Sequence, residues 1–188
     1  MSVANRFLTA IRLVLDSARR GGYRVALIGG FALPFHGVRR ATGDVDFLVE
    51  AVGADVLDAD LLAGGLRQLH RTENAANYES TRSDLSPVDV VFARRPATLA
   101  MLARARDVAT ATGDLSVPVV DVEGIIGLKV QAIANNPQRR RRDEDDIVAL
   151  LERHLPDLDL ALLREYFALF EMLDEFAALL DEARARRH

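Results

Sequence analysis

Apolar residues near the N-terminus recur every three or four positions, as they do in an amphipathic helix. Gly21 and Gly22 interrupt this repeat, and the short apolar run after them ends at Gly29 and Gly30. The repeat predicts a helix and the run predicts a strand. The repeating positions are Phe7, Ile11, Val14, Leu15 and Ala18. The elements predicted here are a helix over 3–20, a strand over 24–28, a short helix over 31–36, a loop over 37–43 and a strand over 45–49.

Shorter apolar stretches follow in the middle of the chain. They predict a mixed sheet of about four or five strands, within the usual size of a sheet. The elements are a helix over 55–69 interrupted near Gly64-Gly65, short pieces around 68–72 and 77–82, a strand over 88–92, a helix over 97–106 and a strand over 117–120.

The last third of the chain has helical periodicity, broken by Asn136-Pro137 and Leu155-Pro156. We predict helices over 121–135, 143–154 and 160–185. The fold class is therefore α+β, with a mixed-sheet core over residues 1–120 and a C-terminal helical bundle over 121–188 that packs on the core. A heptad-like stripe on the final helix is typical of core packing and leaves open a homodimer through that helix. The stripe consists of Leu162, Tyr166, Leu169, Leu173, Phe176 and Leu180.

Composition narrows the functional classes. The absence of cysteine among the 188 residues excludes disulfides, thiolate catalysis and cysteine-based metal sites, and favours a cytoplasmic location. No apolar run approaches the roughly 20 residues that cross a bilayer, so no membrane association is expected. The net charge of −4 disfavours a protein that binds nucleic acid by neutralising many phosphates.

Two acids begin the apolar strand at 45–49. Asp44 and Asp46 are two residues apart, so their carboxylates lie on the same face of the strand, about 6 to 7 Å apart along it. Paired carboxylates repel one another and need compensating positive charge, for which Mg²⁺ is a natural candidate. An Asp-x-Asp pattern also occurs as a turn or a helix cap, an alternative that the two residues alone leave open.

Two further features favour a site for phosphates and metal. Gly29 and Gly30 follow a strand, where their bare backbone lets a phosphate approach, although a tight turn also explains them. Asp89 interrupts the otherwise apolar strand at 88–92. If that strand lies beside the strand of Asp44, Asp89 completes a group of three acids that holds metal and accepts a proton from an attacking hydroxyl. The alternative is a buried Asp bonded by backbone N–H groups.

Residues 27–39 and 40–47, read together with Asp89, resemble the DNA polymerase beta-type nucleotidyltransferase superfamily. The resemblance implies that Gly29 and Gly30 contact the triphosphate and that Asp44, Asp46 and Asp89 bind two divalent ions. Many members have serine at the second glycine, so Gly30 would act through its backbone alone.

The segments Gly127-Leu128-Lys129 to Ala132 and Asp143 to Asp146-Ile147 resemble those of stand-alone bacterial nucleotidyltransferases, including AbiEii-like toxins of type IV toxin–antitoxin systems. This resemblance implies that Lys129, the only lysine of the chain, faces the nucleotide. Arg39 and Thr42 lie in the loop before the acids and are further candidates for the nucleotide site. The guanidinium of Arg39 could bind a phosphate, and the hydroxyl of Thr42 could bond a carboxylate. The alternative for Arg39 is an ordinary exposed charge on a loop.

These features lead to a functional hypothesis. The chain is expected to be an enzyme that uses Mg²⁺ or Mn²⁺ to move a nucleoside monophosphate from a nucleoside triphosphate to a hydroxyl, releasing pyrophosphate. The acceptor could be a tRNA end, a protein or a small molecule, and an antitoxin could be a partner. The alternative is a non-catalytic protein that retains this fold and binds a nucleotide or a partner protein.

Overall fold

The computed structural model describes residues 3–110 and 113–187 and divides the chain into two compact units. Unit 1 contains the described residues within 1–35 and 40–120, and unit 2 contains those within 36–39 and 121–188. Within the described ranges, no helix is both long enough and apolar enough to span a membrane.

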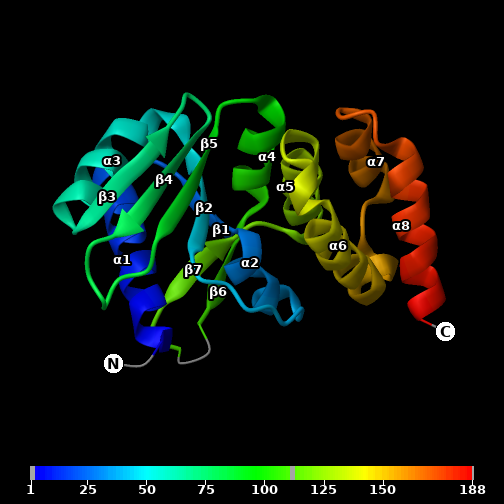
Figure 1. Ribbon diagram of the computed structural model, residues 1–188, viewed down its shortest axis with the longest axis horizontal. Coiled ribbons are helices and arrows are strands. Elements are labelled where there is room, and N and C mark those ends of the chain that lie inside the picture. The colour runs from blue at the N-terminus through cyan, green and yellow to red at the C-terminus, as the bar shows by residue number, and fades with distance from the viewer. Residues whose placement is uncertain (1–2, 111–112, 188) are drawn as a thin grey trace. The chain divides into compact units, whose positions relative to one another are not determined.

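Unit 1 is built on a mixed sheet of seven strands in the order β3-β4-β5-β2-β1-β7-β6 (Figure 1). β2 lies at its centre, antiparallel to β1 and parallel to β5. The strands are β1 (Val25–Ile28), β2 (Val45–Glu50), β3 (Leu66–Arg71), β4 (Ala75–Ser80), β5 (Val88–Ala93), β6 (Arg106–Ala109) and β7 (Ser116–Val119). Most residues of the central strands β1, β2 and β5 are buried, as expected from their apolar sequences.

The helices of unit 1 contribute buried side chains to its core together with the sheet. The predicted apolar repeat of the first helix is buried, with Ile11 and Val14 fully enclosed. This face packs against α3 and β2. The helices are α1 (Val3–Gly21), α2 (Gly29–Ala32), α3 (Ala54–Ala63) and α4 (Pro96–Arg104), with 3₁₀ turns at Leu33–His36 and Ala51–Gly53.

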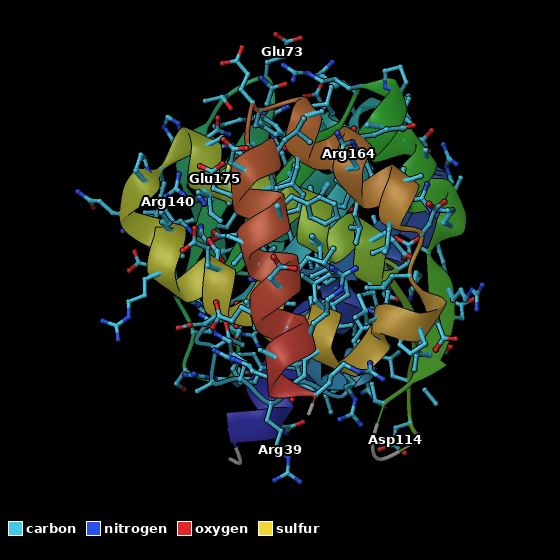
Figure 2. All side chains as sticks on the ribbon, turned by 90° about the vertical axis from the view of Figure 1, so that its right-hand side faces the viewer. Arg39, Glu73, Asp114, Arg140, Arg164 and Glu175 are labelled. Carbon is cyan, nitrogen blue, oxygen red and sulfur yellow. The ribbon has the colours of Figure 1, made fainter. Side chains whose placement is uncertain are left out.

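Unit 2 is a bundle of helices. Asp121 and Asp159 cap two of them by accepting hydrogen bonds from the backbone N–H groups of Gly124 and Leu162. Arg140, on α6, reaches Glu175, on α8, with 3.4 Å between Nη1 and Oε1 (Figure 2). The helices are α5 (Val122–Asn135), α6 (Arg140–His154), α7 (Leu160–Ala168) and α8 (Leu173–Arg186), with 3₁₀ turns at Pro137–Arg139 and Leu155–Asp157.

The predicted α+β class, with a mixed sheet and C-terminal helices, is confirmed, but the strand count was too low. The helix expected over 55–69 ends at Ala63, because Gly64 and Gly65 follow and Gly65 has φ of +96°. The short piece predicted around 68–72 is part of strand β3, which begins at Leu66, whereas the strand at 106–109 was not predicted. Both strands lie at the ends of the sheet and are largely exposed, so their apolar alternation is weak.

The single helix predicted over 160–185 is wrong, since α7 and α8 are separate helices. The chain turns between them, where Glu171 has φ of +58°. This turn divides the predicted stripe: Tyr166 and Phe176 are buried, whereas Leu169 at the turn is 66% exposed. The stripe is therefore not one continuous surface, and the homodimer inferred from it stays a prediction.

Tyr78 anchors β4 to α3. Its side chain is 1% exposed, and its hydroxyl donates to Oδ1 of Asp58 over 2.9 Å. Burial first, and then the hydrogen bond to Asp58, raises the pKa of Tyr78 to about 12. Because successive side chains of a strand alternate between faces, this anchor also fixes the face on which Asn77 lies.

The raised pKa of Tyr78 predicts a pH-dependent stability difference between wild type and Tyr78→Phe. Below about pH 10 the phenol is neutral in both the folded and the unfolded state, so we expect wild type to be more stable by about 1 kcal/mol. Between pH 10 and 12 only the unfolded state ionises, so this advantage is lost as the pH rises. Urea unfolding followed by circular dichroism from pH 8 to 11.5 measures the difference, and a constant difference would contradict the assignment.

Candidate active site

Three carboxylates converge on one face of the sheet in unit 1. Asp46 on β2 lies directly opposite Asp89 on β5, and Asp44 immediately precedes β2. One oxygen from each of the three side chains lies within 4.8 Å of the others, and all three residues are partly exposed. The structure therefore brings together the three acids that the sequence predicted would meet.

The chemistry of this group suits a hard divalent cation. Carboxylate oxygens are the ligands that Mg²⁺ and Mn²⁺ prefer, and three carboxylates this close repel one another unless positive charge lies between them. The hydroxyl of Thr42 donates to Oδ1 of Asp44 over 2.6 Å, and the amide of Asn77 donates to Oδ1 of Asp89 over 2.8 Å. Both donors are neutral, so they orient the carboxylates without cancelling their charge.

Two features of position 29 require a glycine: its backbone conformation and the nearby side chain of Asp46. Its φ is +65°, and a Cβ placed there would lie 2.0 Å from Oδ2 of Asp46. The missing side chain of Gly29 is thus the space that the Asp46 carboxylate occupies. Gly30 is less tightly confined, with Oγ1 of Thr42 at 3.0 Å from a Cβ built on it.

Gly29→Ala is expected to displace the Asp46 carboxylate and weaken metal binding. The backbone strain alone costs about 1–2 kcal/mol, as for any residue with a Cβ at positive φ. Gly22→Ala is the matched control, because Gly22 has φ of +67° but nothing within 4 Å of a built Cβ. Thermal unfolding should show a loss of stability in both variants, larger in Gly29→Ala because of its clash with Asp46, whereas Mn²⁺ titration should show weaker binding only in Gly29→Ala. Equal Mn²⁺ affinity in the two variants would contradict this role of Gly29.

Asn77 was missed by the sequence analysis. Asparagine is depleted in strands, so its presence within the stretch 75–80 is a weak signal of a special role. The contact with Asp89 depends on the pairing of β4 with β5, in which Asn77 and Asp89 are direct partners. No local pattern in the sequence specifies that pairing.

Lys129 lies in unit 2, where it is 7% exposed on α5. Its Nζ donates to Oδ1 of Asp143 over 2.9 Å and to Oδ2 of Asp146 over 2.6 Å, and both acids lie on α6. Arg139 adds a contact from Nε to Oδ2 of Asp143 at 3.2 Å. The lysine and the two acids that the sequence singled out thus form one buried ionic cluster that joins two helices.

Arg39 and Thr42 have different environments. Arg39 is exposed and extends away from the ribbon (Figure 2). Thr42 bonds Asp44 and lies against Gly30, as described above, so it belongs to the group around the carboxylates. Of the two, only Thr42 has a contact in the structure that bears on its predicted role.

The family of the chain follows from comparison with known proteins. A family model described as "Nucleotidyl transferase AbiEii toxin, Type IV TA system" matches residues 12–187. The chain belongs to this AbiEii family. No curated protein sequence matches it.

Solved structures with the same fold are also nucleotidyltransferases or similar to them. The solution structure of the antibiotic-resistance factor ANT(2″)-Ia has a TM-score of 0.61 and 19% identity, covering 96% of this chain and 97% of that one. The crystal structure of ANT(2″)-Ia with adenylyl-2″-tobramycin has a TM-score of 0.58 and 18% identity, with 87% and 96% covered. An antigenic nucleotidyltransferase-like protein from Paracoccidioides brasiliensis has a TM-score of 0.56 and 16% identity, with 95% and 94% covered. At these identities the likeness shows that this AbiEii protein has the nucleotidyltransferase fold.

Proposed function

We propose that this AbiEii protein transfers a nucleoside monophosphate from a nucleoside triphosphate to a hydroxyl acceptor and releases pyrophosphate. The convergence of Asp44, Asp46 and Asp89 carries this proposal. Membership of a nucleotidyltransferase family supports the proposal. These three acids are also the ones that the resemblance to the DNA polymerase beta-type superfamily assigns to the metal site.

The three carboxylates would hold Mg²⁺ or Mn²⁺. When bound, such an ion would neutralise the charge of the phosphates and lower the pKa of the attacking hydroxyl. The surroundings of the acids favour this role: Thr42 bonds Asp44, Asn77 bonds Asp89, and Gly29 leaves room for Asp46. A preformed set of ligands needs little reorganisation when the cation binds.

The residues of the chain then have separate tasks in the transfer. The acceptor oxygen forms a bond to the α-phosphorus while the bond to pyrophosphate breaks, and the hydroxyl proton passes to the Asp89 carboxylate. Gly29 and Gly30 would contact the phosphates through their backbone. The resemblance also gives Arg39 and Lys129 as candidates for offsetting the charge of the triphosphate, although the ammonium of Lys129 already pairs with Asp143 and Asp146.

The biological setting that we propose is a toxin paired with an antitoxin, as in the type IV systems for which the family is named. The acceptor could be a tRNA end, a protein or a small molecule. Adenylyl-2″-tobramycin in one structure of the same fold is a reason to include small hydroxyl compounds among the acceptors tested.

Labelled nucleotides test the proposed reaction. Each nucleoside triphosphate, labelled at either the α- or the γ-phosphate, is incubated with the protein, Mg²⁺ and separate RNA, protein and small-molecule fractions of a cell lysate. We expect α-label to join one fraction, γ-label to appear in pyrophosphate, and EDTA to prevent both. Transfer of γ-label to an acceptor would indicate a kinase instead.

The non-catalytic alternative has its own outcome. Calorimetry with ATP, with and without Mg²⁺, measures binding independently of turnover. Binding of a nucleotide together with no transfer to any fraction would favour a binding protein that retains the fold.

A further inference from the structure

Each of the three carboxylates of the candidate site has a different neighbour. Thr42 bonds Asp44, Asn77 bonds Asp89, and Gly29 leaves the space that the Asp46 carboxylate occupies. Thr42 and Gly29 belong to the segments that carry the family resemblance, whereas Asn77 lies outside them, on β4.

Asn77 is held in place from several sides. β4 pairs with β3 on one side and with β5 on the other, and the second pairing sets Asn77 directly opposite Asp89. Direct partners on antiparallel strands have their side chains on the same face, about 4.5–5.5 Å apart at Cβ. On the opposite face, the buried Tyr78 fixes the strand to Asp58 of α3. The pairing of β4 with β5 therefore places the amide of Asn77 next to the Asp89 carboxylate.

The contact restricts a motion that Asp89 would otherwise have. Rotation of an aspartate carboxylate about χ2 is broad, so the direction of its oxygens is set mainly by its hydrogen bonds. A neutral amide suits this task because it orients the carboxylate without neutralising its charge. An arginine or lysine at position 77 would instead compete with the metal ion for the carboxylate. Partners that orient metal ligands in this way typically change metal affinity about 10–100-fold when they are removed.

We propose that Asn77 is a positioning residue, which holds the carboxylate of Asp89 in the orientation that completes the metal site with Asp44 and Asp46. This inference rests on the proposed function, because it assigns to Asn77 a role in the same metal site. In this role Asn77 acts through Asp89, the side chain to which its amide donates.

Mn²⁺ binding by the full chain, followed by electron paramagnetic resonance, tests the proposal without requiring a known acceptor. Asn77→Leu keeps the approximate size of the side chain and removes its donor. We expect its Mn²⁺ affinity to fall at least about tenfold, with a changed signal from the bound ion. Asn74→Ala is the matched control, since Asn74 is exposed next to β4 and its only described bonds are through its backbone.

A double-mutant cycle shows whether Asn77 acts through Asp89. In an Asp89→Ala background, where Mn²⁺ is held by Asp44 and Asp46, Asn77→Leu should change the affinity less than about twofold. Equal losses in the two backgrounds, or an unchanged affinity of Asn77→Leu in the wild-type background, would overturn the proposal. If Asn77→Leu does not fold, as judged by circular dichroism, Asn77→Ala takes its place in the cycle.

Failure of the proposed function gives a different result. If wild type itself binds no Mn²⁺, the metal site of the proposed function is wrong, and the role of Asn77 falls with it. If wild type binds Mn²⁺ and only the Asn77 effect is missing, the proposed function stands and this inference alone is wrong.

Discussion

Asp46→Asn should transfer nucleotide at least about 10³-fold more slowly than wild type. Asparagine keeps the shape of the side chain but removes a negative charge from the group of three carboxylates. We expect the transition state to lose several kcal/mol of charge stabilisation. Since each 1.4 kcal/mol changes the rate about tenfold, this loss corresponds to the roughly 10³-fold slower transfer. Transfer of α-label to the acceptor fraction, at saturating Mg²⁺ and nucleotide, measures the effect.

The control for Asp46→Asn is Asp107→Asn. Asp107 is an exposed aspartate on β6, at the edge of the same sheet, with no described side-chain partner. Its substitution should leave transfer and thermal stability unchanged. If Asp46→Asn kept more than about a tenth of wild-type activity, the catalytic role of the three acids would be wrong.

Lys129→Met should destabilise the protein by about 3–5 kcal/mol, the usual cost of removing one partner from a buried ion pair. Asp143 and Asp146 are 1% and 7% exposed and both bond the ammonium of Lys129, so its removal leaves two buried acids with their main cation missing. The contact from Arg139 replaces little of this charge, because that side chain is 51% exposed. Urea unfolding followed by circular dichroism measures the free energy of unfolding.

Arg184→Met provides the comparison for Lys129→Met. Arg184 pairs with Asp181 on the surface of α8, where both side chains are more than half exposed, so we expect a loss below about 1 kcal/mol. Adding Asp143→Asn and Asp146→Asn to Lys129→Met should recover part of the stability, because the two buried side chains that lose the ammonium of Lys129 then carry no charge. A loss from Lys129→Met no larger than that from Arg184→Met would show that the buried cluster does not stabilise unit 2.

The parts of the fold that could be predicted are those with a local signal. The buried strands β1, β2 and β5 are runs of apolar residues ended by glycine, proline or acids, and their positions followed from that pattern. The edge strands β3 and β6 carry mostly exposed residues and so have a weak signal: β3 was predicted only as a short piece around 68–72, and β6 was not predicted. The break between α7 and α8 falls within a continuous apolar repeat, where the local pattern favours one long helix.

The candidate site shows the same division. Asp44, Asp46 and Asp89 could be selected because two acids at the start of one apolar strand and a third acid within another strand together need compensating positive charge. Asn77 could not, since its contact with Asp89 is created by the pairing of two strands that the sequence does not specify. The partners of Lys129 lie 14 and 17 residues away and meet it through the packing of α5 against α6, which also has no local signature.

Anomalous diffraction from crystals grown with Mn²⁺ and a non-hydrolysable nucleoside triphosphate would locate the metal ion relative to the three acids. We expect a manganese peak within coordination distance, about 2.0–2.6 Å, of oxygens from Asp44, Asp46 and Asp89, with the triphosphate on the same ion. A bound triphosphate whose manganese touches none of these three carboxylates would contradict this expectation.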